Sequence, residues 1–130
     1  MSIWIDTSEW PIVRHITEGS ATDAEIDAYI QEASDLLRRS EPHGVIMDVR
    51  SLTQATPYAR QRKKVWLAEN VELLRRTCVC TALILTSPIA RFAAATVMLV
   101  HPFPTPYRIF GTEQEALAWV RVQLRAKGLT

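Results

Sequence analysis

Residues 44–60 read Gly-Val-Ile-Met-Asp-Val-Arg-Ser-Leu-Thr-Gln-Ala-Thr-Pro-Tyr-Ala-Arg. Residues 45–47 and Val49 form an apolar run without polar alternation, which is typical of a strand covered by helices on both faces. Asp48 interrupts this run near the carboxyl end of the strand. Its carboxylate either faces a crevice at the edge of the sheet or accepts hydrogen bonds from loop amides. We expect the rest of the chain to pack around this strand.

The composition predicts one domain that spans residues 1–130. The chain has 130 residues, of which 48% are hydrophobic, so it can bury a substantial core. Fifteen basic and 14 acidic residues give a formal net charge of +1. This balance offers no general electrostatic reason to expect nucleic acid or an anionic membrane surface as a partner.

The cellular location is predicted from the ends of the chain and from its cysteines. The first ten residues, Met-Ser-Ile-Trp-Ile-Asp-Thr-Ser-Glu-Trp, lack the basic leader and long apolar core of a secretory signal. No apolar segment approaches the roughly 20 residues of a membrane span. Cys78 and Cys80 lie in an apolar run, where we expect a buried, reduced pair on one face of a strand. Together these features predict a soluble cytoplasmic protein.

Apolar periodicity and capping signals give the order of elements. Two apolar runs joined by a polar turn, residues 3–5 and 12–16, predict a hairpin at the edge of the sheet. Thr22 and Glu25 form a capping box at the start of an amphipathic helix. Further helices are predicted over 57–76, over 89–100 and after Thr112, with strands over 78–85 and 107–110 between them.

Two helix starts follow two neighbouring strands, at Thr56-Pro57 and at Ser87-Pro88. If these strands are parallel, their carboxyl ends and the free amides of both helices meet at one edge of the sheet. We therefore predict a site for an anion or for a partner's carboxylate at this edge. Its candidate residues are Asp48, Arg50, Ser51, Thr53, Thr56, Arg60, Ser87 and Arg91.

The helix predicted over 89–100 has almost no polar face. It is expected to be either deeply buried or part of an interface, and we predict that it mediates a two-fold homodimer. The same helix and the segment that follows it could instead line an apolar pocket. The candidate residues for the interface or pocket are Phe92, Val97, Met98 and Phe103.

Alternating strands and helices predict an α/β sandwich with a mostly parallel sheet. The chain resembles the SpoIIAA-like superfamily, which includes STAS domains and SEC14-type domains. The resemblance is carried by Trp10, the Val45 to Asp48 strand, Arg60, the Ser87 to Arg91 helix start, Pro102 to Pro106, Phe110 and Ala116 to Trp119. It implies a five-stranded, mostly parallel sheet with an antiparallel edge strand and four helices.

The resemblance also implies a non-enzymatic regulatory or protein-interaction module that binds another protein or itself. In STAS antagonists a serine at the start of the helix after the central strand is phosphorylated. The segment Gln54-Ala55-Thr56-Pro57 stands there and lacks that motif. A carrier or sensor of a lipid or other hydrophobic small molecule is the first alternative. An enzyme is the second, although the sequence has no phosphate loop, nucleophile motif or metal-spaced cluster. No cofactor or metal is expected.

Overall fold

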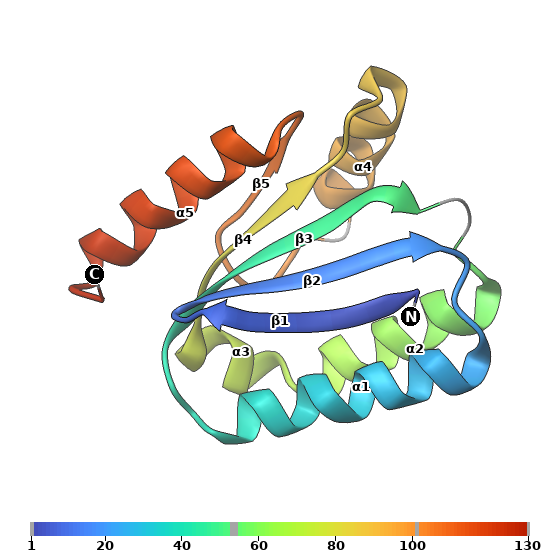
Figure 1. Ribbon diagram of the computed structural model, residues 1–130, viewed down its shortest axis with the longest axis horizontal. Helices are drawn as coiled ribbons and strands as arrows, with labels where there is room; N and C mark the ends of the chain where they lie inside the picture. The colour runs from blue at the N-terminus through green and yellow to red at the C-terminus, as the bar shows by residue number, and fades with distance from the viewer. Residues whose placement is uncertain (1, 53–54, 101, 130) are drawn as a thin grey trace.

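The computed structural model describes residues 2–52, 55–100 and 102–129. Over these residues the chain forms one five-stranded sheet and five helices (Figure 1). In chain order the elements are β1 (Ile3–Glu9), β2 (Ile12–Gly19), α1 (Asp23–Arg38), β3 (His43–Leu52), α2 (Pro57–Glu69), α3 (Val71–Thr77), β4 (Cys78–Ile84), α4 (Pro88–Val100), β5 (Tyr107–Phe110) and α5 (Glu113–Ala126).

The strands follow one another across the sheet in the order β1-β2-β3-β4-β5. β1 pairs antiparallel with β2, and every other pairing is parallel. This arrangement confirms the predicted edge hairpin and the mostly parallel sheet. It also brings the carboxyl ends of β2 to β5 to one edge, as parallel pairing requires.

Local sequence signals place several helix starts correctly. The Thr22 hydroxyl accepts a hydrogen bond from the backbone amide of Glu25, and the Glu25 carboxylate accepts one from the backbone amide of Thr22. These two bonds complete the predicted capping box of α1. Thr56 caps α2, whose first residue is Pro57. Thr112 caps α5 by accepting from the backbone amide of Glu115.

The prediction of four helices is wrong, because the helix expected over 57–76 is divided at Asn70 into α2 and α3. The Asn70 side-chain amide donates to the backbone carbonyl of Trp66 at 2.8 Å, and the backbone amide of Asn70 donates to the same carbonyl at 3.1 Å. Asparagine competes in this way with regular helix geometry. No proline or glycine marks the break in the sequence, and the apolar periodicity continues through it. The pattern therefore predicted a single helix.

The sheet separates two apolar layers. On one face, α5 packs over the centre of the sheet, and α1, α2 and α3 cover the other face (Figure 1). Gly44 lets α5 approach β3 closely, since an added Cβ would stand 2.8 Å from the Val120 Cγ1 atom. The layer under α5 contains Ile12, Ile46, Cys80, Ala82, Ile84, Ala116, Val120 and Leu124.

The two cysteines do not share one face of the strand, contrary to the prediction. Cys80 packs in the layer under α5, whereas Cys78 packs beside Leu37 and Leu74 in the layer under α1 and α3. The register between β3 and β4 shifts between His43 and Gly44, opposite these two cysteines, and this irregularity breaks the regular alternation. Both thiols are free and buried.

Helix α4 is not deeply buried. It projects from the carboxyl end of β4, away from the two layers of helices, and its most extensive contact is with β5 (Figure 1). Ile89, Phe92 and Leu99 are 83%, 77% and 85% exposed, and no described residue of the helix is buried. Among the described residues, none packs over this apolar surface closely enough to bury a residue of α4.

Candidate functional site

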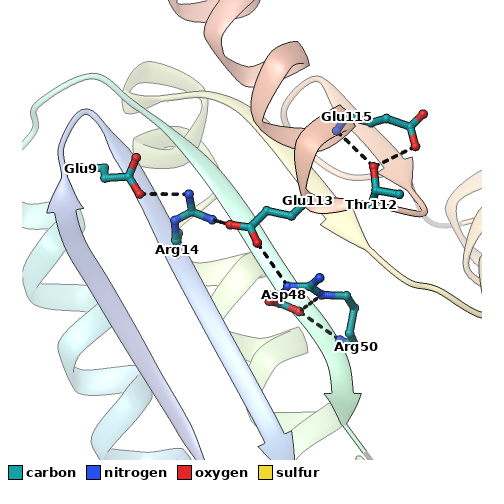
Figure 2. A network of polar contacts seen from close by, with 7 residues as sticks. All are labelled: Glu9, Arg14, Asp48, Arg50, Thr112, Glu113 and Glu115. Carbon is teal, nitrogen blue, oxygen red and sulfur yellow. Dashed lines mark hydrogen bonds and ion pairs between the residues drawn. The ribbon is translucent and has the colours of Figure 1, made fainter.

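Charged residues of β1, β2, β3 and α5 form a chain of ion pairs on the α5 side of the sheet. Asp48 and Arg50 pair at 2.7 Å, and Arg50 reaches Glu113 at 3.5 Å. Glu113 also pairs with Arg14, which holds Glu9 at 3.0 Å (Figure 2). The first turn of α5 is thus tied to β2 and β3.

The network contains more carboxylates than guanidinium groups. Two arginines face three carboxylates, which are those of Glu9, Asp48 and Glu113. The hydrogen bond from Arg50 holds the pKa of Asp48 below its ordinary value, and Asp48 in turn raises the pKa of Arg50. Both groups are therefore ionised and paired, which leaves little positive charge to attract an anion.

The other residues predicted for this edge make local contacts. Arg60 donates to the carbonyl of Ala55 at 2.7 Å, and Ser87 accepts from the backbone amide of Ala90 at 3.3 Å. Arg91 donates to the carbonyls of Leu85 and Thr86 at 3.0 and 2.8 Å.

The residues predicted for this edge therefore do not all point to one site. Ser51 is exposed at the end of β3, and Thr53 lies outside the described residues. Within the described residues, no hydrogen bond or ion pair joins Asp48 to Ser87 or Arg91. A partner or anion site at this edge stays a prediction.

A cavity lies on the opposite face, between the sheet and the layer of α1, α2 and α3. The space open to the centre of a water-sized sphere is about 80 Å³. One water needs roughly 10–15 Å³ by this measure, so the cavity can hold an organic group of several atoms. Its apolar wall includes Ile30, Ala33 and Leu37 of α1, Trp66 and Leu67 of α2, Val45 and Met47 of β3, and Phe103.

One part of the cavity wall is polar. The Nδ1 atom of His15 and the hydroxyl of Tyr29 are 2.5 Å apart, and the two rings meet edge to face with their centroids 5.6 Å apart. Burial lowers the pKa of His15 to about 3 and raises that of Tyr29 well above its ordinary value. Both side chains are therefore neutral at physiological pH.

Lys63 brings the only ammonium group to this wall among the described lining residues. Its Nζ atom lies 5.8 Å from the centroid of the Tyr29 ring, within reach of a cation–π contact. Burial lowers the pKa of Lys63. No ion pair joins Lys63 to any residue that the structure describes.

A less covered part of the sheet begins at Met47 in the cavity wall. Met47, Leu83 and Ile109 are neighbours in register across β3, β4 and β5, and all three are half-buried. Phe103 lines the cavity, as the pocket prediction allowed, and stacks on Tyr107 with the ring centroids 5.0 Å apart. The other candidates lie on α4 and do not line the cavity. Phe92 and Val97 are exposed, and Met98 is half-buried.

Of the residues that line this cavity, only Phe103 was predicted from the sequence for a pocket. The wall combines residues of β2, α1, β3, α2, α3, β4 and the segment before β5, which only the tertiary fold brings together. His15 and Lys63 are two ionisable side chains of this wall. Sequence spacing does not show that they approach the same ring.

Within residues 2–52, 55–100 and 102–129, no group of three or more histidine, cysteine or acidic side chains could hold a metal ion. Over the same residues, every helix is too short or too polar to cross a bilayer.

No protein-family model matches the chain, and no curated protein matches it in sequence. The structure is similar to that of an uncharacterised protein of the DUF3478 family from Shewanella loihica PV-4, which is described as having a SpoIIAA-like fold. The superposition covers 91% of each chain with a TM-score of 0.71 and 15% sequence identity. This likeness confirms the resemblance at the level of the fold: the chain has a SpoIIAA-like α/β fold.

Proposed function

We propose that this protein is a non-enzymatic carrier or sensor of a small hydrophobic molecule, which it binds in the cavity between the sheet and helices α1 to α3. The single observation that supports this function is the cavity itself, with its largely apolar wall. Protein interiors pack densely and contain few voids larger than a water. An apolar void of this size lowers stability unless something fills it.

The proposal assigns no catalytic residue. A general acid or base works best with a pKa near the operating pH. Burial moves the pKa of His15 down to about 3 and moves that of Tyr29 upward, so both are displaced from neutrality. These two side chains serve here as a polar patch that orients a ligand.

Blocking the cavity is expected to abolish ligand retention. Ala33 is 2% exposed and lines the cavity, so Ala33→Phe places an aromatic ring in the space that the ligand would occupy. Overpacking also costs stability, about 1–3 kcal/mol. Native mass spectrometry of the purified protein should detect a bound small molecule in the unmodified chain and none in the folded variant. The control is Ala28→Phe, at an exposed position of the same helix.

Two results would contradict this function. One is that the unmodified protein carries no small molecule and binds none from a library of apolar compounds. The other is that Ala33→Phe folds and retains the ligand as well as Ala28→Phe does.

A specific observation also favours a second function, a protein-interaction module of the regulatory type. The observation is the exposed apolar surface of α4, formed by Ile89, Phe92, Val97, Leu99 and Val100. We infer that this surface associates with a second copy of the chain. A closed two-fold dimer covers the same patch on both subunits.

Phe92→Glu is expected to convert the dimer into a folded monomer, because it places a charge in the centre of an apolar interface. Analytical ultracentrifugation measures the change. Val122→Glu, at a 55% exposed position on α5, is the control and should leave the dimer intact. Met98, which is half-buried, is a poorer choice because its replacement also disturbs the fold. A monomeric unmodified protein at high concentration would exclude self-association through α4.

A further inference from the structure

The ammonium of Lys63 is the feature of the cavity that an apolar ligand alone leaves unexplained. It lines a cavity whose wall is otherwise mostly apolar, and burial disfavours its charged form. Buried charges in proteins are normally paired. Among the described residues, however, no acidic side chain forms an ion pair with Lys63.

The neighbouring polar groups are already engaged with one another. The His15 Nδ1 atom and the Tyr29 hydroxyl are 2.5 Å apart. Asp27, an acidic residue of α1 that faces α2, accepts from Arg62 at 3.1 Å and from the Tyr58 hydroxyl at 2.5 Å. The Asp27 carboxylate thus pairs with Arg62, the residue that precedes Lys63 on α2.

We propose that the ligand is amphipathic, with one carboxylate that pairs with Lys63 and an apolar body that lies along Ala33, Met47, Trp66 and Phe103. This inference rests on the proposed carrier or sensor function. A bound carboxylate supplies a counter-charge for Lys63 and favours the charged form of its amine.

The number of cations sets the charge of the ligand. Lys63 is the one cationic side chain among the described residues that line the cavity, and burial keeps His15 and His43 in their neutral forms. A monoanion is balanced by this single ammonium, whereas the second charge of a phosphate monoester would remain unpaired at a desolvation cost. The arrangement therefore selects a carboxylic acid with a short acyl or aryl body.

The experiment compares octanoate with 1-octanol, which has the same chain length and no charge, by isothermal titration calorimetry below the micellar range. The unmodified protein is expected to prefer octanoate by roughly tenfold to hundredfold, the range for a hydrogen bond to a charged group. Lys63→Met should remove this preference and leave 1-octanol binding within about threefold. Lys64→Met, at the exposed neighbouring position of α2, is the matched control and should keep the preference.

Each outcome tests a different statement. Equal binding of octanoate and 1-octanol to the unmodified protein overturns the inference about the carboxylate and leaves the carrier function in place. An unchanged preference in folded Lys63→Met also overturns it. If neither compound nor any shorter homologue binds, the proposed function itself fails. Because the first comparison uses the unmodified chain, it decides the inference even if Lys63→Met does not fold.

Discussion

Replacing Ile46 with alanine is expected to lower the free energy of unfolding by about 2–5 kcal/mol. Ile46 is fully buried at the centre of β3, and it packs in the layer under α5 with Ile84, Val120 and Leu124. Truncation removes the transfer free energy of the lost methyl and methylene groups and leaves a cavity that strands on both sides prevent from collapsing. Urea unfolding at neutral pH measures the change.

The control for this substitution is Val122→Ala, which also shortens a β-branched side chain. Val122 is 55% exposed on α5, so the expected change is within about 0.5 kcal/mol. Equal losses of stability at the two positions would contradict the burial of Ile46.

The fold was predictable because its signals are local and agree with one another. The apolar run at 45–47 predicted a strand covered on both faces, and Val45 and Ile46 are buried in the layers on its two sides. Thr22, Thr56 and Thr112 marked three helix starts through side-chain hydrogen bonds that span only three residues. Such interactions are fixed by sequence spacing alone, so they could be predicted before the tertiary arrangement was known.

The remaining features depend on contacts between distant parts of the chain. Asn70 ends α2 through a bond to Trp66, although asparagine also occurs within helices. The composition of α4 predicted burial or an interface, but its position away from the sheet depends on where the connections to β4 and β5 hold it. Lys63 lies in the first half of α2, and only the packing of α2 on α1 brings it to the Tyr29 ring.

The same reason explains how the residues predicted for the edge site are placed, while the site itself stays a prediction. Asp48 and Arg50 lie two residues apart and form the ion pair that their proximity allows. Glu113 joined them from the start of α5, which sequence spacing could not show. Arg91 donates instead to the carbonyls of Leu85 and Thr86, in the connection between β4 and α4. The guanidinium group carries several donors, and these backbone acceptors are within its reach.

The stability of the protein is expected to fall by about 1.4 kcal/mol for each pH unit between about pH 6.5 and 4.5 through His15 alone. The pKa of His15 is about 3 in the folded state against an ordinary value of 6.5. Between these values the unfolded chain binds a proton that the folded chain does not, so acid favours unfolding. The contribution is nearly absent above pH 7 and grows as the pH falls.

The cause of this effect is the position of His15 in the cavity wall. Its Nδ1 atom is paired with the Tyr29 hydroxyl, and the groups that act on its charge are Lys63 on α2 and His43 on β3, both of which disfavour a proton. Carboxylates contribute at lower pH. Hydrogen bonds from Ser2 and Thr22 lower the pKa of Glu25 to about 2, so its contribution is lost mainly below its ordinary value of 4.5. Between pH 4.5 and 6.5, the change in stability with pH therefore comes mostly from the histidines.

His15→Gln is designed to remove this titration while the amide keeps a hydrogen bond to Tyr29. Urea unfolding at a series of pH values should give a slope that is lower by about 1.4 kcal/mol per pH unit than that of the unmodified protein. His43→Gln is the control. Burial also lowers the pKa of His43, but replacing His43 leaves in place the contribution of His15 to the pH dependence of the unfolding free energy. If His15→Gln and the unmodified protein show the same slope, His15 accepts a proton in the folded state. The cavity wall would then carry two cations, Lys63 and His15, and a dianionic ligand would fit it better than a carboxylate.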